Sequence, residues 1–254
     1  MAELSTLAHI AAGAAAAGAG LVNAIAGGGT LISFPVLTAI GVPGVCANAT
    51  NSVALLPGYL GGVTAQRRDL VGLGGRVRPQ LVAAALGGLC GSILLIVTSE
   101  TVFRQIVPFL ILAACALLAG QEWLRAKLFG SGTEHTEHAL AQVVSIAAAS
   151  TYGGYFGAGL GIMLLAILGL FSTLPLNRLN AVKQLLSVVT SAASVAFLVF
   201  SGRVEWSLVA VMAPASLVGG NLGGRLASRL APKRLRAGVI AFGVVVALIY
   251  LRRL

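Results

Sequence analysis

The sequence predicts an all-α polytopic membrane protein with two inverted repeats, each a glycine-broken helical hairpin followed by three transmembrane helices. Of its 254 residues, 57% are apolar and only 9% are charged, and the mean hydropathy is +0.95. A soluble domain carries about a quarter of its residues as charged side chains. Eight apolar segments follow one another between short polar stretches, and two of them are interrupted by glycine clusters at matching places.

The composition also excludes several other classes. The chain lacks the polarity of a disordered segment, the Gly-X-Y period of collagen and the many cysteines of a disulfide-rich secreted domain. Its three cysteines, Cys46, Cys90 and Cys115, are widely spaced in apolar sequence and are expected to be buried thiols. No basic residue precedes Arg67, so we expect the N-terminal apolar stretch to belong to the fold rather than to a secretory signal.

The eight segments differ in length. They span residues 4–41, 46–65, 79–99, 102–121, 139–172, 179–201, 206–224 and 237–251. Six of them are close to the roughly 20 residues that a helix needs to cross the hydrocarbon layer. The other two are too long, and each contains a glycine cluster, at 27–29 and at 153–161. Because glycine weakens a helix and lets the backbone turn, each long segment is predicted to form a hairpin.

The two long segments begin two similar halves. Shifting the first half along the chain so that Pro43 falls on Pro175 aligns the two halves, and we call this shift the repeat offset. It also places Ala-Asn-Ala-Thr-Asn-Ser at 47–52 on Leu-Asn-Ala-Val-Lys-Gln at 179–184. We therefore divide the chain into a first transmembrane repeat at 1–125, a loop at 126–138 and a second repeat at 139–254. The His and Glu residues of the loop could bind a metal, but a solvated connection is favoured.

The basic residues predict an orientation. If all eight segments simply cross the membrane, the basic residues divide 9 to 7 between the two faces. If each long segment returns as a hairpin, they divide 12 to 4, which agrees better with the excess of Lys and Arg on the cytoplasmic side. Both termini then lie outside the cytoplasm. The larger group comprises Arg67, Arg68, Arg76, Arg78, Arg125, Lys127, Arg178, Arg225, Arg229, Lys233, Arg234 and Arg236. Since its members lie in clusters between apolar segments, the net charge of +10 is attributed to membrane orientation and not to nucleic-acid binding.

Lys183 is the charged residue placed clearly inside a crossing segment. A buried charge in a membrane usually faces a cavity or a partner, and an anionic substrate would be the natural partner here. The alternative is a side chain that extends to the membrane surface.

Several polar residues near the two glycine clusters could complete an anion site. Asn48, Asn51 and Asn180 occupy related helix starts, where they could bind substrate, cap a helix or bond to a neighbouring helix. Thr30 could donate a hydrogen bond or cap a helix, and Tyr155 could line a cavity or pack as an aromatic ring. Free amide groups at the glycine breaks would also favour an anion.

Enzymatic chemistry finds little support. The sequence has no Gly-x-Ser-x-Gly elbow, no Walker A sequence, no His-Glu-x-x-His and no pair of acids within the apolar segments. We expect neither catalysis nor a cofactor.

The motifs together resemble the TauE/SafE family of sulfite exporters, also called TSUP. The resemblance rests on Asn-Ala-Ile-Ala-Gly-Gly-Gly at 23–29, Ala-Asn-Ala-Thr-Asn-Ser at 47–52, Gln-Arg-Arg-Asp-Leu at 66–70, Tyr-Gly-Gly-Tyr-Phe-Gly-Ala-Gly-Leu-Gly at 152–161, Leu-Asn-Ala-Val-Lys at 179–183 and Gly-Arg-Val-Glu-Trp at 202–206. It implies a bacterial inner-membrane transporter of sulfur-containing anions such as sulfite, sulfoacetate or other organosulfonates. The positions that match the paired motifs are Gly27, Gly28, Gly29, Asn48, Asn51, Gly157, Gly159, Gly161, Asn180 and Lys183. The first glycine run has three residues where many relatives have four.

The resulting hypothesis is export of a small sulfur-containing anion through a central site between the repeats, without a coupling ion. Import of a sulfur compound, transport of another small anion and a non-transporting membrane scaffold remain alternatives. The oligomeric state stays open.

Overall fold

The computed structural model describes residues 5–25, 27–129, 139–172, 174–226 and 232–252, and throughout these ranges its secondary structure is helical. The predicted all-α class is confirmed. Most of the predicted inter-repeat loop, including the possible metal ligands Glu134, His135, Glu137 and His138, lies outside the described residues. Within them, no group of three or more His, Cys, Asp or Glu side chains comes together.

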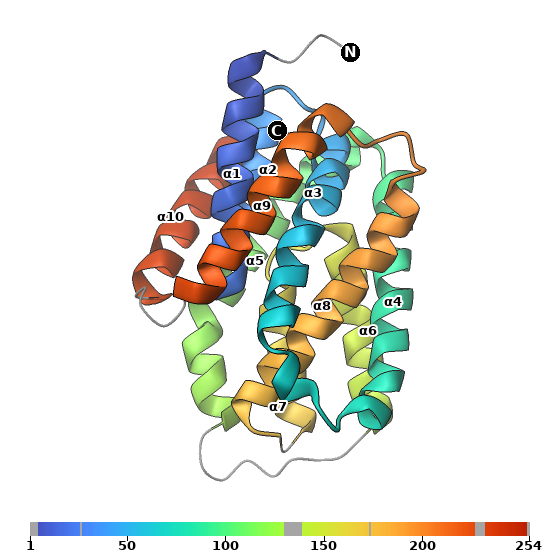
Figure 1. Cartoon of the computed structure of the whole chain (residues 1–254). Helices are drawn as coiled ribbons and strands as arrows, with labels where there is room; N and C mark the ends of the chain where they lie inside the picture. The colour runs from blue at the N-terminus through green and yellow to red at the C-terminus, as the bar shows by residue number, and fades with distance from the viewer. Residues whose placement is uncertain (1–4, 26, 130–138, 173, 227–231, 253–254) are drawn as a thin grey trace.

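Within the described ranges, each half of the chain contains five α-helices (Figure 1). The first half comprises α1 (Thr6–Ile25), α2 (Thr30–Ala39), α3 (Gly44–Ala65), the short 3-10 helix η1 (Arg67–Leu70), α4 (Gly74–Val97) and α5 (Glu100–Phe129). The second half comprises α6 (Ala139–Tyr155), α7 (Leu160–Phe171), α8 (Leu176–Leu198), α9 (Trp206–Leu226) and α10 (Pro232–Leu251).

The lengths of the helices fit a membrane bundle. Five helices, α1, α4, α5, α8 and α9, contain stretches of 18 to 23 residues that are apolar and long enough to cross a membrane. Large apolar side chains such as Leu86, Phe109 and Leu140 are more than half exposed, as expected for contact with lipid. By contrast, α2 and α7 have only 10 and 12 residues. The two segments that looked too long are therefore each divided into a long helix and a short one.

The chain reverses direction at each of these divisions. Both termini lie at the upper end of Figure 1, which we call the termini end, whereas η1 and the turn from α7 to α8 lie at the opposite end, which we call the basic end. The α1–α2 hairpin opens towards the termini end and the α6–α7 hairpin opens towards the basic end. The structure thus has the hairpin arrangement, which is the one for which the sequence analysis divided the basic residues 12 to 4 between the two faces.

The repeat offset extends through the helices. Helices α3, α4 and α5 begin at Gly44, Gly74 and Glu100, and α8, α9 and α10 begin at the equivalent positions in the second half, Leu176, Trp206 and Pro232. The packing follows the same rule, because α1 packs against α9 as α6 packs against α4, and α3 packs against α9 as α8 packs against α4. These matched contacts support two repeats; their inverted relation in a membrane stays a prediction.

Glycine allows the closest of these contacts. A Cβ atom on Gly91 of α4 would lie 2.0 Å from the carbonyl oxygen of Thr151 in α6, and a Cβ atom on Gly219 of α9 would lie 2.0 Å from that of Ala17 in α1. Any larger residue would push these backbones apart. The two helices that lead into the breaks, α1 and α6, are therefore held against the opposite half of the molecule.

Candidate functional site

The first break, between α1 and α2, is ordered by an asparagine. Gly27 and Gly28 have φ angles of +75° and +89°, a left-handed conformation that favours glycine. The side-chain oxygen of Asn23 accepts a hydrogen bond from the Gly29 amide at 2.7 Å, and its Nδ2 donates to the Tyr59 hydroxyl at 3.2 Å. Asn23 thereby connects α1, the break and α3.

The second break, between α6 and α7, is ordered by a tyrosine. Gly157 and Gly159 have φ angles of +80° and +81°, and Gly159 is the N-cap of α7. The hydroxyl of Tyr152 donates to the carbonyl oxygen of Ala158 at 2.8 Å. Each break is therefore a fixed turn that places the N-terminus of a short helix inside the bundle.

The two breaks lie against each other. A Cβ atom on Gly157 would lie 3.9 Å from Thr30 Oγ1 at the start of α2, and one on Gly27 would lie 3.8 Å from Ile162 Cγ1 at the start of α7. Because the first amide groups of a helix carry partial positive charge, the starts of both short helices favour an anion in this region.

A cavity of about 160 Å³ lies at this junction, and we call it the central cavity. At about 30 Å³ for each water molecule in the liquid, it has room for about five waters or one small ligand. Among the residues that line it, six were predicted from the sequence, namely Gly27, Gly28, Gly157, Gly161, Asn180 and Lys183. Five further polar residues were not predicted, namely Asn23, Tyr59, Gln184, Ser187 and Arg236.

The lining of the central cavity is cationic. It includes Lys183 and Arg236 and, in the part of the chain that the structure describes, no carboxylate. The aliphatic part of Lys183 lies beside Gly161, where a Cβ atom would be 3.7 Å from Lys183 Cδ. Within the described residues, Lys183 makes neither an ion pair nor a hydrogen bond. An amine in this setting is suited to an anion small enough for the cavity.

The other six predicted residues do not line the central cavity. They are Gly29, Thr30, Asn48, Asn51, Tyr155 and Gly159. Gly29 packs on the backbone of Ala19, and Asn48 is fully buried and donates from Nδ2 to the Tyr155 carbonyl oxygen at 2.6 Å. The Tyr155 ring packs against Phe103, with ring centres 5.9 Å apart.

The helix-capping alternatives are wrong. Pro43 and Pro175 stand at the N-cap positions of α3 and α8, so Asn48 and Asn180 lie more than one turn inside their helices. Gly29 stands at the N-cap of α2, where no side chain caps the helix. Proline fixes its own backbone angle and lacks an amide donor, so at α3 and α8 it defines the helix start more strongly than an asparagine one turn later does.

A periodic signal could have found two of the missed residues. Asn180, Lys183, Gln184 and Ser187 follow the i, i+3, i+4, i+7 spacing of one helix face, and all four line the cavity. Arg236 was assigned to the membrane surface, yet α10 carries it to the cavity.

Comparison with known proteins agrees with the motifs. The family model described as sulfite exporter TauE/SafE matches residues 12–250. A probable membrane transporter protein of Haemophilus influenzae is 29% identical over 212 residues, which cover 82% of this chain and 80% of that protein. The probable membrane transporter protein YfcA of Escherichia coli K12 is 24% identical over 235 residues, which cover 90% and 84% of the two chains. No solved structure matches this chain significantly.

Proposed function

Because this chain belongs to the sulfite exporter TauE/SafE family, whose relatives above are named as membrane transporters, we propose that it exports a small sulfur-containing anion. Sulfite, sulfoacetate and related organosulfonates are the candidates that the family suggests. The anion would bind in the central cavity, between two inverted repeats, and would contact Lys183, Asn180 and the glycine breaks.

The observation that carries this proposal is the position of Lys183. It lies seven residues into α8, about 10 Å along the helix from its start, and its charge meets no acid among the described residues. A buried amine is costly in a membrane unless a partner accompanies it. With a volume of about 160 Å³, the cavity admits a small anion and is smaller than the 300 Å³ or more that drug-sized ligands occupy.

The basic end is proposed to face the cytoplasm of a bacterial inner membrane. Arg67 and Arg68 belong to η1, and Arg78, Lys127 and Arg178 lie near those ends of α4, α5 and α8 that are at the basic end in Figure 1. Arg104 lies near the start of α5, Arg203 follows α8 and Arg252 follows α10, and these helix ends are at the termini end. An excess of basic residues marks the cytoplasmic side of bacterial membrane proteins. Both termini are then outside the cytoplasm.

An inside-negative membrane potential is sufficient to drive export. It favours outward movement of a monovalent anion by about 2.3 kcal/mol per 100 mV, which corresponds to about a 50-fold concentration ratio. Acidic side chains that could relay protons are not found in the described lining of the central cavity. We therefore propose uniport of the anion, without a coupled ion.

The proposal is tested with purified protein in thermal-shift and liposome-flux experiments. Sulfite, sulfoacetate, thiosulfate and sulfate are compared, for the wild type, Lys183→Met and the matched control Lys127→Met, whose exposed amine lies 5.1 Å from the centre of the Trp123 ring. We expect one sulfur anion to stabilise the wild type and the control, and to be carried by both at similar rates. Lys183→Met should lose both effects.

Three results would contradict the proposal. Equal anion flux in Lys183→Met and Lys127→Met would remove Lys183 from the site. Flux that requires a proton or sodium gradient would exclude uniport, and net accumulation against an inside-negative potential would favour import. Folded protein that binds and carries none of the anions would favour another substrate or the scaffold alternative.

A further inference from the structure

The six predicted residues outside the central cavity are related to its lining by the repeat. The repeat offset maps Asn180, Lys183 and Asn23 of the cavity onto Asn48, Asn51 and Tyr155, which are packed on the other side of the breaks. Asn48 and Asn51 are 0% and 2% exposed. One set of positions thus lines a cavity, while their repeat equivalents Asn48 and Asn51 are buried and Tyr155 is partly buried.

The two buried asparagines contain polar atoms without partners. The side-chain oxygens of Asn48 and Asn51 are both buried and accept no hydrogen bond from the residues that the structure describes. For Asn48 the orientation of the amide is set, because its nitrogen donates to the Tyr155 carbonyl oxygen. Buried acceptors without donors are costly and rare in native proteins. A second state in which water reaches these oxygens and donates to them would explain why the two asparagines are retained, and the same opening would expose their side-chain nitrogens to an anion.

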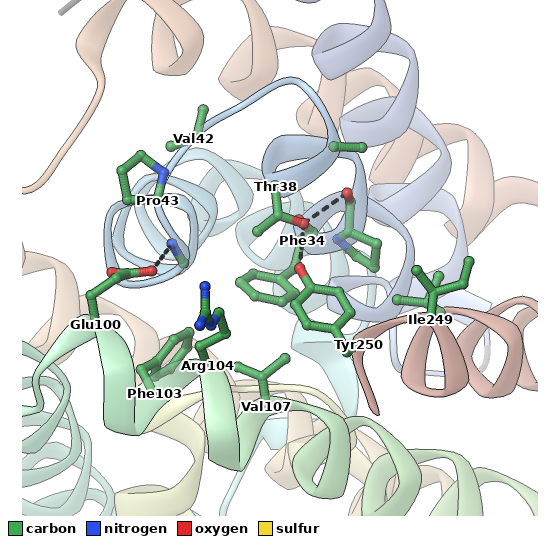
Figure 2. Close-up of a pocket in the computed structure, with 14 residues that line it drawn as sticks. Phe34, Thr38, Val42, Pro43, Glu100, Phe103, Arg104, Val107, Ile249 and Tyr250 are labelled. Carbon is green, nitrogen blue, oxygen red and sulfur yellow. Dashed lines mark hydrogen bonds between the residues drawn. The ribbon is translucent and has the colours of Figure 1, made fainter. Parts of the chain in front are cut away.

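A second cavity lies towards the termini end, between α2, α5 and α10, and we call it the outer cavity (Figure 2). Its volume is about 510 Å³. Arg104 projects into it, and the repeat offset places Arg104 on Arg236 of the central cavity, so the two arginines are also equivalent. Glu100 also lines this cavity, where its carboxylate accepts hydrogen bonds from the amides of Gly44 and Val45 at the start of α3.

Three buried aromatic rings separate the outer cavity from the second break, and we call them the aromatic plug. The ring of Phe34 packs edge-on against Phe103 and Phe156, with ring centres 6.1 Å and 5.4 Å apart. Phe34 and Phe103 also line the outer cavity, whereas Phe156 belongs to the break. The equivalent positions in the other half are Ala166, Leu235 and Ala24, none of which is aromatic. The cluster of aromatic rings is therefore present on one side of the repeat relation only.

We infer that Asn48, Asn51 and Tyr155 form a second, outward-open form of the anion site, which joins the outer cavity when the aromatic plug parts. This inference rests on the proposed transport of a small anion. In that state Arg104 would attract the leaving anion, while the central cavity closes around Asn180 and Lys183. Since the equivalent of Lys183 is the neutral Asn51, the outer form would hold an anion by side-chain nitrogens alone, with Asn48 Nδ2 exchanging its bond to the Tyr155 carbonyl for the anion, and would release it more readily.

Cysteine accessibility tests the second site without altering its binding groups. Ser33, in the first turn of α2, is buried and is the repeat equivalent of Leu165 in the central cavity. Ser33→Cys is compared with Ser187→Cys, which lines the central cavity, in protein whose three native cysteines are replaced by alanine. A charged, membrane-impermeant methanethiosulfonate is added to one side of oriented vesicles.

We expect Ser187→Cys to react from the basic end and Ser33→Cys to react from the termini end. Adding Phe34→Ala, or Phe34→Leu if alanine prevents folding, should speed the Ser33→Cys reaction at least tenfold. The transported anion should slow it. A Ser33→Cys protein that carries the anion but stays unreactive from the termini end, with or without the Phe34 change, would overturn the second site and leave the proposed function intact. Reaction from that end in a protein that carries no anion would instead contradict the proposed function.

Discussion

Replacing Gly91 by alanine tests how the packing of α4 positions the candidate site. A Cβ atom at this position would lie 2.0 Å from the Thr151 carbonyl oxygen and 2.7 Å from the Tyr155 amide nitrogen. Both neighbours are backbone atoms of α6, so no side chain can rotate away. To reach an ordinary contact of 3.4 Å, α4 and α6 must separate by about 1.4 Å.

The cost follows from this displacement. Overpacking of this kind destabilises a protein by about 1 to 3 kcal/mol, which lowers the melting temperature of a chain of this size by about 2 to 12 °C. Because α6 ends at Tyr155, the shift is also transmitted to the second break at Gly157. Gly91→Ala should therefore lose anion-induced stabilisation as well as thermal stability.

The assay is a thermal melt of purified protein with and without the anion, and Gly18→Ala is the matched control. Gly18 lies in α1, and no neighbouring atom comes within 4 Å of the position of its Cβ. Alanine is the better helix former by about 0.5 to 1 kcal/mol, so the control should melt no lower than the wild type. If Gly91→Ala melts and binds anion like Gly18→Ala, the inferred contact between α4 and α6 is wrong.

Three further substitutions probe the site. Asn23→Ala removes the bond to the Gly29 amide and a tyrosine contact, so we expect a loss of about 1 to 3 kcal/mol in thermal stability together with slower flux; unchanged flux would show that the first break orders itself. Gly161→Ala should melt like the wild type but bind anion at least fivefold more weakly in titration, because the added methyl lies 3.7 Å from the Lys183 side chain; unaltered affinity would place the anion elsewhere. Glu100→Gln weakens the cap of α3 and should lower stability by about 0.5 to 2 kcal/mol in denaturant melts without changing anion affinity; a stable variant would contradict the capping role.

Much of the fold could be predicted from patterns that reflect simple physics. The lengths of the apolar segments and their glycine clusters indicated two hairpins, because a segment of more than 30 apolar residues exceeds one crossing. The structure divides both segments at the glycines, into α1 with α2 and α6 with α7. The spacing of Pro43 and Pro175 likewise indicated the repeat offset that all the later helices follow.

The candidate site was harder to predict because its lining depends on how helices cross. Tyr59 lies four turns beyond the start of α3, and only the packing of that helix brings it to Asn23. The repeat offset predicted Asn48 and Asn51 as equivalents of Asn180 and Lys183, but a sequence does not state which of two equivalent positions lines a cavity. That difference depends on how the helices pack, and in the structure Asn180 and Lys183 line the central cavity while Asn48 and Asn51 are buried.

The differences between equivalent positions are informative for the same reason. Two halves with the same helix offsets and matched contacts place equivalent residues in equivalent backbone environments. The difference between Lys183 in one half and Asn51 in the other is therefore not explained by folding, since neither half requires a charge at this position to form its helix. The difference between Phe34 and its equivalent Ala166 is likewise not explained by the formation of their helices. Under the proposed orientation, the cationic member of the first pair faces the side from which the anion is captured. The aromatic member of the second pair closes the side to which the anion is released. Both features, in this order, suit the proposed export, whereas a membrane scaffold has no use for either.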